Sequence, residues 1–254
     1  MKFLSKCYIG LIFLLLYIPI VVLIVFSFNE SGSLAEFSGF SFVWYEELFH
    51  DEEAFSALRN SLVLAISSAA IATVLGTFGA LGLHRMKRRY IKQPIMTLTN
   101  IPMMNPDIVT GMSMMLFFAA VVGIFKIADY SEIGFLAMLI AHTTFCLPYV
   151  ILSVLPRITE LGDTLSEAAL DLGCTPFQSF FKVELPQIMP GIISGLIMAF
   201  TLSLDDFVIS YFTIGSGFET LPIRIYSMTK KEVKPDIYAL STLMIVVVTV
   251  LMVM

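Results

Sequence analysis

Residues 167–190, EAALDLGCTPFQSFFKVELPQIMP, form a polar segment that lies between two long apolar stretches of the chain. From residue 165 to residue 172, apolar side chains recur at helical spacing with acidic side chains between them. Thr164 and Glu167 have the spacing of a capping box, and Gly173 is a typical C-terminal stop. The segment therefore begins as a short amphipathic helix.

A second short helix is predicted after the glycine. Thr175 and Pro176 are a typical helix start, and the helix is expected to run through Lys182 and to end near Leu185 and Pro186. The sequence therefore predicts two small helices joined by a sharp turn over residues 164–186.

The rest of the chain has the composition of an integral membrane protein. Hydrophobic residues make up 57% of the 254 residues and charged residues 14%, whereas soluble domains have about a quarter charged residues. The first apolar run, residues 8–28, is about 21 residues long and is followed by no A-x-A-like cleavage site, so we expect it to remain as a span. Lipid is therefore an expected partner, and nucleic acid is not.

Six stretches are long and apolar enough for membrane spans, which need about 20 helical residues. They are residues 8–28, 61–83, 95–125, 133–155, 188–214 and 237–254. The third contains IPMMNPDIVTGM, where Pro102, Pro106 and Gly111 are expected to kink or break it. Asn105, Pro106 and Asp107 together are typical of a new helix start. The predicted fold class is all-α, a single polytopic domain with six transmembrane helices.

Lysine and arginine residues predict the orientation of these spans. With a cytoplasmic N-terminus, most of these side chains fall on the cytoplasmic side, chiefly because of the cluster HRMKRRYIK at residues 84–92. Both termini and residues 164–186 are then cytoplasmic, and the acidic run at residues 46–53 is external. The external stretch around Trp44 is expected to lie at the membrane interface, and a docking surface for an external protein is the alternative.

The polar segment resembles the coupling-loop signature of ABC importer permeases. The matching residues are Glu167, Ala168, Ala169, Gly173, Val183, Leu185 and Pro186. Val183 replaces the usual isoleucine of the family. The resemblance implies a type I importer permease fold, with a cytoplasmic coupling loop between spans four and five that inserts into a groove of an ATP-hydrolysing subunit.

The chain itself is not expected to be an enzyme. It has no G-x-x-x-x-G-K-[ST] loop and no cluster of His, Cys and acidic residues at metal-ligand spacing, so ATP and Mg are expected on a partner subunit and no cofactor on this chain. His50, His84 and His142 are isolated in the sequence, and no catalytic role is expected for them.

Three carboxylates fall inside predicted spans. Asp107, Asp205 and Asp206 would each cost a few kcal/mol at the bilayer centre without water or a partner, so they are candidates for function. Phe207 and Tyr211 follow the pair, and carboxylates beside aromatic rings favour an organic cation. The alternatives are that Asp107 caps a helix and that one acid of the pair faces a neighbouring helix. Because adjacent helical residues point about 100° apart, we expect only one of the two to face a pathway.

Several stretches extend the resemblance to the spermidine/putrescine permease subunits, of the C-subunit type. They are AHTTFCLPYV at 141–150, EAALDLGCTPFQSF at 167–180, AFTLSLDDFVISYF at 199–212 and TLPIRIYS at 220–227. The likeness implies a polyamine permease of a bacterial cytoplasmic membrane. Its implied partners are two copies of an ATP-binding subunit, a second homologous permease and an extracytoplasmic polyamine-binding protein.

Two other functions stay open at this point. A permease of the same build for iron, thiamine or a sulfate-like solute is one. A secondary transporter that uses its intramembrane aspartates as proton relays is the other, although a self-sufficient transporter needs no coupling loop.

Overall fold

A computed structural model describes most of the chain. The described residues are 2–31, 36–86, 88–125, 134–162, 164–215, 218–230 and 236–253. Within them all regular secondary structure is helical, and turns, irregular segments and one isolated bridge between Asn29 and Phe40 join the helices. The chain forms two compact units, residues 1–59 with 221–254, and residues 60–220. Helix α3 (Glu52–Arg85) contains residues of both units.

The first unit is built around the helix α12. This helix (Asp236–Val253) contacts α1 (Lys2–Phe26), α2 (Val43–His50) and α11 (Leu221–Thr229). The buried core of this unit comprises Leu48, Ala54, Leu221, Ala239 and Leu240. Trp44, in α2, donates its indole N–H to the carbonyl oxygen of Asn29 at 2.7 Å. The interfacial role expected for the stretch around Trp44 stays a prediction.

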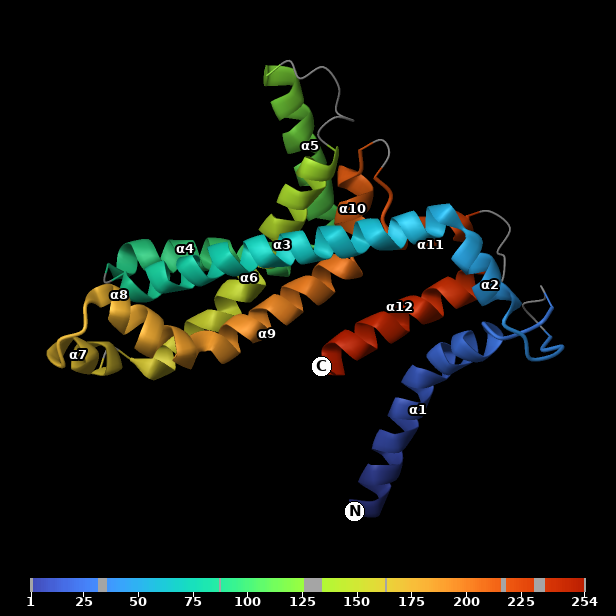
Figure 1. The fold of residues 1–254 in the computed structure, drawn as a ribbon, viewed down its shortest axis with the longest axis horizontal. Coiled ribbons are helices and arrows are strands. Elements are labelled where there is room, and N and C mark those ends of the chain that lie inside the picture. The colour runs from blue at the N-terminus through green and yellow to red at the C-terminus, as the bar shows by residue number, and fades with distance from the viewer. Residues whose placement is uncertain are drawn as a thin grey trace. The chain divides into compact units, whose positions relative to one another are not determined.

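The second unit is centred on α6 and α9, which run side by side (Figure 1). After α3 it contains α4 (Arg89–Met104), α5 (Asp107–Phe125), α6 (Gly134–Leu161), α7 (Thr164–Asp171), α8 (Pro176–Ser179), the π-helical turn η2 (Phe180–Glu184), α9 (Leu185–Leu204) and α10 (Val208–Thr213). Its core is a continuous cluster of apolar side chains that includes Phe145, Val150 and Val154 of α6 with Ile188 and Ala199 of α9.

A glycine allows the close approach of α6 and α9. A Cβ atom added at Gly191 would lie 2.8 Å from Cγ of Arg157 and 3.0 Å from the carbonyl oxygen of Ser153. The second of these atoms belongs to the backbone of α6 and moves only if the helix moves. The spacing of the two helices therefore depends on the missing side chain, as in other membrane helix pairs with small residues at the contact.

Among the residues that the structure describes, five helical segments are long and apolar enough to cross a membrane. They are Lys6–Phe26, Glu52–Arg85, Asp107–Ile124, Gly134–Leu161 and Pro176–Leu204. The sixth predicted span coincides with α12, whose apolar part, Asp236–Val250, is shorter than these five. The predicted helical membrane fold is confirmed, and the count of six spans is not. Ile133 and Met254, at the ends of two predicted spans, lie outside the described residues.

Two of the predicted spans are interrupted. The third is broken at Asn105 and Pro106, as predicted, while Pro102 and Gly111 lie inside α4 and α5. The fifth was expected to be one helix over residues 188–214, and this was wrong. It ends as α9 at Leu204 and resumes as α10 at Val208, because the Asp206 carboxylate accepts from the N–H groups of Ile209 and Ser210 and so caps a new helix.

Candidate functional site

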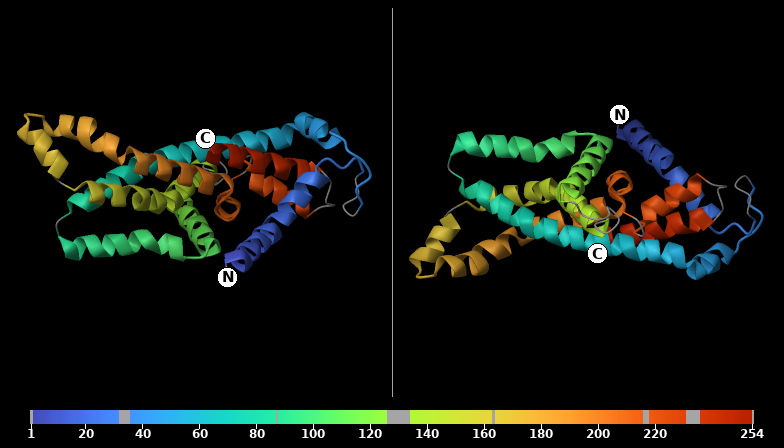
Figure 2. Two further views of the ribbon diagram at one scale, coloured as in Figure 1. Left: turned by 90° about the horizontal axis from the view of Figure 1, so that it is seen from below. Right: turned by 90° about the horizontal axis from the view of Figure 1, so that it is seen from above.

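The polar segment folds as a turn between two short helices at one end of the α6–α9 pair (Figure 1). Two further views place α7 and α8 at the same end (Figure 2). Helix α7 ends in a Schellman motif, in which Cys174 N–H donates to the carbonyl oxygen of Ala169 at 3.0 Å and Gly173 N–H to that of Leu170 at 2.9 Å. Gly173 has φ +88°, a conformation that favours glycine. The predicted stop at Gly173 is confirmed.

The next helix begins with a capping box. Thr175 Oγ1 accepts from Gln178 N–H at 3.3 Å, and Thr175 N–H donates to Gln178 Oε1 at 3.1 Å. The predicted start at Thr175 and Pro176 is therefore confirmed. Helix α7 starts at Thr164, and the residue before it lies outside the described residues. The capping box predicted for Thr164 with Glu167 therefore stays a prediction.

The predicted end of this second helix near Leu185 and Pro186 was wrong. The helical path continues from α8 through η2 into α9, and Pro186 lies in the first turn of α9. A proline has no N–H and its ring crowds the carbonyl four residues earlier. The wider π turn directly before Pro186 accommodates both effects, since Leu185 N–H reaches back to the carbonyl oxygen of Phe180. The coupling segment is thus continuous with a spanning helix.

Contacts inside the segment hold α7 against α8. Ser166 and Ser179 share a hydroxyl contact of 3.2 Å, and Ser179 is buried. Ala169 is buried as well. Where the segment joins α9, Arg85 Nη2 of α3 lies 3.4 Å from Glu184 Oε2. These contacts join the segment to the ends of the longer helices.

The outer side of the segment presents large apolar side chains. Leu172 is 87% exposed and Phe177 is 72% exposed. Of the residues expected to couple to an ATPase, Glu167, Ala168, Gly173 and Pro186 are exposed, and Leu185 and Val183 are half-buried. A cleft of about 330 Å³ lies on the inner side, lined in part by Glu167, Leu170 and Glu184. The projecting turn can therefore offer both apolar and acidic contacts.

The two adjacent aspartates face different surroundings at the break between α9 and α10. Asp205 ends α9 and is exposed. The side chain of Asp206 is only 7% exposed, and its carboxylate accepts from Ser210 N–H at 2.9 Å and from Ile209 N–H at 3.4 Å. The two carboxylates therefore lie in different surroundings, although neither residue lies in a helix, and the expectation that only one of them faces a pathway stays a prediction.

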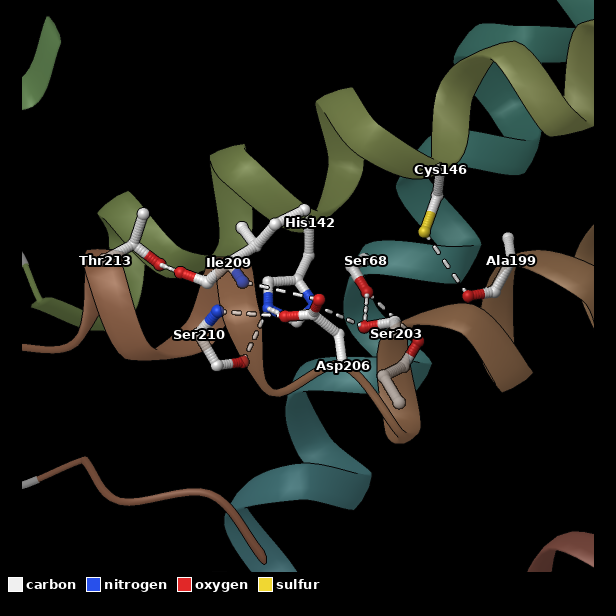
Figure 3. A network of polar contacts seen from close by, with 10 residues as sticks. Ser68, His142, Cys146, Ala199, Ser203, Asp206, Ile209, Ser210 and Thr213 are labelled. Carbon is white, nitrogen blue, oxygen red and sulfur yellow. Dashed lines mark hydrogen bonds and ion pairs between the residues drawn. The ribbon is translucent and has the colours of Figure 1, made fainter. Parts of the chain in front are cut away.

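His142 joins this break to the rest of the unit (Figure 3). Its Nδ1 lies 2.8 Å from Ser203 Oγ and its Nε2 lies 2.9 Å from Ser210 Oγ, while Asp206 Oδ2 is 3.6 Å from Nε2. Ser68 Oγ of α3 adds a contact of 2.8 Å to Ser203 Oγ. In the sequence His142 has no ligand-like neighbours, so its role was missed. The available signal was a titratable side chain inside the predicted span of residues 133–155.

The other expected path residues lie around the same break. Phe207 and Tyr211 have ring centroids 5.4 Å apart, and Tyr211 is 45% exposed. Asp107 is exposed in the first turn of α5, and α5 packs on α10. The structure thus brings Asp107, Asp205, Phe207 and Tyr211 to one region of the second unit, where carboxylates and rings can attract a cation.

Comparisons with known proteins give a consistent result. The family model described as "Binding-protein-dependent transport system inner membrane component" matches residues 72–254. The chain is 41% identical to the putrescine transport system permease protein PotI of Escherichia coli strain K12, over 92% of this chain and 82% of that protein. It is 38% identical to the spermidine/putrescine transport system permease protein PotC of Haemophilus influenzae, over 99% of this chain and 95% of that protein.

A solved structure shares the fold. The structure of a bacterial ABC transporter involved in the import of the acidic polysaccharide alginate matches with a TM-score of 0.76, covering 99% of this chain and 91% of that chain at 16% identity. At this identity the likeness concerns the fold alone.

Proposed function

The chain belongs to the binding-protein-dependent transport system inner membrane component family, and from this premise we propose that it is the permease subunit of an ATP-driven importer of polyamines. The observation that carries the substrate class is the identity of about 40% with the two polyamine permeases along nearly the whole chain. The exposed acid and aromatic rings at the α9–α10 break agree with a cationic substrate.

Residues 164–186 are the surface that docks on the ATP-binding subunit. The exposed side chains of Leu172 and Phe177 supply apolar anchors, and the exposed carboxylate of Glu167 supplies a polar contact. Because the turn continues without interruption through η2 into α9, movement of the ATP-binding subunit reaches the α9–α10 break along one helix. Gly173, Ala168 and Ala169 shape the turn, and Leu185 and Pro186 form its junction with α9.

The transported cation passes Asp205, Phe207 and Tyr211, with Asp107 contributing a further carboxylate. The sequence predicted Asp206 as a path residue as well. In this proposal Asp206 does not contact the cation but supports the path by accepting hydrogen bonds from the backbone of α10. The path is completed by a second homologous permease, and a binding protein outside the membrane delivers the substrate.

The complex contains two copies of the ATP-binding subunit, which hold the ATP and Mg. The chain lies in the bacterial cytoplasmic membrane with both termini in the cytoplasm, the orientation that places residues 164–186 beside those subunits.

Reconstitution tests this proposal. The chain is incorporated into proteoliposomes with its second permease and ATP-binding subunit, and uptake of radiolabelled spermidine is measured with the loaded binding protein, with and without ATP. We expect uptake that requires ATP and this chain, persists when an ionophore removes the proton gradient, and is reduced by unlabelled putrescine. Competition by thiamine or sulfate instead would assign another substrate, and uptake that follows the proton gradient without ATP would refute the importer mechanism.

A further inference from the structure

His142 contacts both sides of the break between α9 and α10. Ser203 is the second-to-last residue of α9, and Ser210 is the third residue of α10. One ring nitrogen of His142 meets each hydroxyl, at 2.8 Å and 2.9 Å. A single side chain from α6 therefore contacts both helix ends.

The chemistry of this bridge suits an imidazole. A neutral histidine carries one donor and one acceptor on opposite sides of a rigid ring, and a serine hydroxyl can fill either role. His142 is fully buried, and Ser203 and Ser210 are buried as well, so loss of the ring would remove one hydrogen-bond partner from each hydroxyl in a dry environment. Ser203 also contacts Ser68, which ties α3 to the same bridge.

The bridge lies beside the two aspartates, which face different surroundings. Asp206 is turned inward, where it accepts from two N–H groups of α10 and lies 3.6 Å from His142. This arrangement leaves Asp205 on the outer side of the same break, with Phe207 and Tyr211 following it. Asp205 ends α9, whereas Phe207 and Tyr211 belong to the start of α10, so moving one helix end relative to the other changes the position of Asp205 relative to the ring pair.

We propose that His142 is a positioning residue for transport: by bridging Ser203 and Ser210 it holds Asp205 and the Phe207–Tyr211 ring pair in the arrangement that the transported cation meets. This inference rests on the proposed function. It assigns the contact with the cation to Asp205 and the role of an internal anchor to Asp206.

A labelling experiment in the assembled transporter tests the inference. Cys7 and Cys174 are replaced by Ser, and Thr201→Cys introduces a reporter one turn before Asp205, without altering any proposed path residue. The rate at which a small cationic methanethiosulfonate labels this cysteine is measured over a range of spermidine concentrations. We expect spermidine to slow the labelling when His142 is present.

In the His142→Ala variant, the spermidine concentration for half-protection should rise about tenfold, the change expected from losing about one net buried hydrogen bond. His142→Asn and His142→Gln each retain the reach to one of the two serines, so they should give intermediate values, and they carry the test if the alanine variant does not assemble. Cys146→Ala is the matched control, because Cys146 is also buried on α6 but contacts Ala199, before the break, at 3.4 Å.

The results that would overturn the positioning role of His142 differ from the result that would overturn the proposed path. Equal protection in the His142-containing protein and all His142 variants would overturn the positioning role. Absence of protection by spermidine in the His142-containing protein would overturn the proposed path itself. An equal rise in half-protecting concentration in Cys146→Ala would show that any change in the α6–α9 core has this effect, and would likewise overturn the inference.

Discussion

Replacing Gly173 with alanine changes the turn between α7 and α8 through the backbone alone. A Cβ atom at this position meets no heavy atom within 4 Å, so no steric clash contributes. The residue has φ +88°, and for a residue with a side chain a left-handed conformation costs about 1–2 kcal/mol. The Schellman bonds from Gly173 and Cys174 must either carry this strain or break.

That cost should appear as weaker binding of the ATP-binding subunit. If the subunit binds only the intact turn, about 1.4 kcal/mol of strain corresponds to about tenfold weaker binding. The assay is a titration of the solubilised permease pair with purified ATP-binding subunit, followed by substrate-stimulated ATP hydrolysis in proteoliposomes. The melting temperature of the permease should change little, because the turn is exposed and lies outside the core.

A series at the same position separates strain from other effects. Gly173→Asn should lose less binding than Gly173→Ala, because asparagine enters the left-handed region more readily. Gly173→Asp should insert into the membrane normally, yet it should lose coupling because it adds a charge beside the exposed Leu172. Equal binding by the glycine, alanine and asparagine forms would refute the reasoning from backbone strain.

Three further changes have distinct expected outcomes. Gly191→Leu should separate α6 from α9 and destabilise the protein by about 1–3 kcal/mol, seen as a lower melting temperature in detergent. Asp206→Asn should weaken the N-terminal cap of α10 by about 1 kcal/mol, because the amide loses the charge and one acceptor oxygen, and this too should lower the melting temperature. Phe177→Ala should reduce co-purification of the ATP-binding subunit while the melting temperature is retained.

Each of these changes has a matched control. Gly82→Leu adds a side chain where no heavy atom lies within 4 Å and should leave the melting temperature unchanged. Asp205→Asn should slow polyamine uptake at an unchanged melting temperature, and an equal loss of stability in both aspartate variants would contradict the division between them. Tyr90→Ala removes a comparably exposed ring outside the segment, and loss of the ATP-binding subunit in this variant would show that the effect of Phe177 is not local.

Local signals explain what could be predicted of the coupling segment. The stop at Gly173 and the start at Thr175 depend on bonds between residues three to five positions apart, so a short stretch of sequence contains all of their partners. The break at Pro106 could be predicted for the same reason, because a proline acts only on the helical turn that precedes it in the sequence. The continuation through Pro186 was missed because a π turn leaves no comparable pattern in the residues.

Composition and short-range hydrogen bonding were enough to predict the membrane class, the apolar segments and the position of the projecting turn. The different surroundings of Asp205 and Asp206, in contrast, arise from contacts between helices that are distant in the chain. The partners of His142 lie 61 and 68 residues away along the chain, on helix ends that meet only after α6 packs against α9 and α10. The carboxylates of Asp205 and Asp206 are chemically identical, and only the direction imposed by this packing makes one an exposed charge and the other an internal cap.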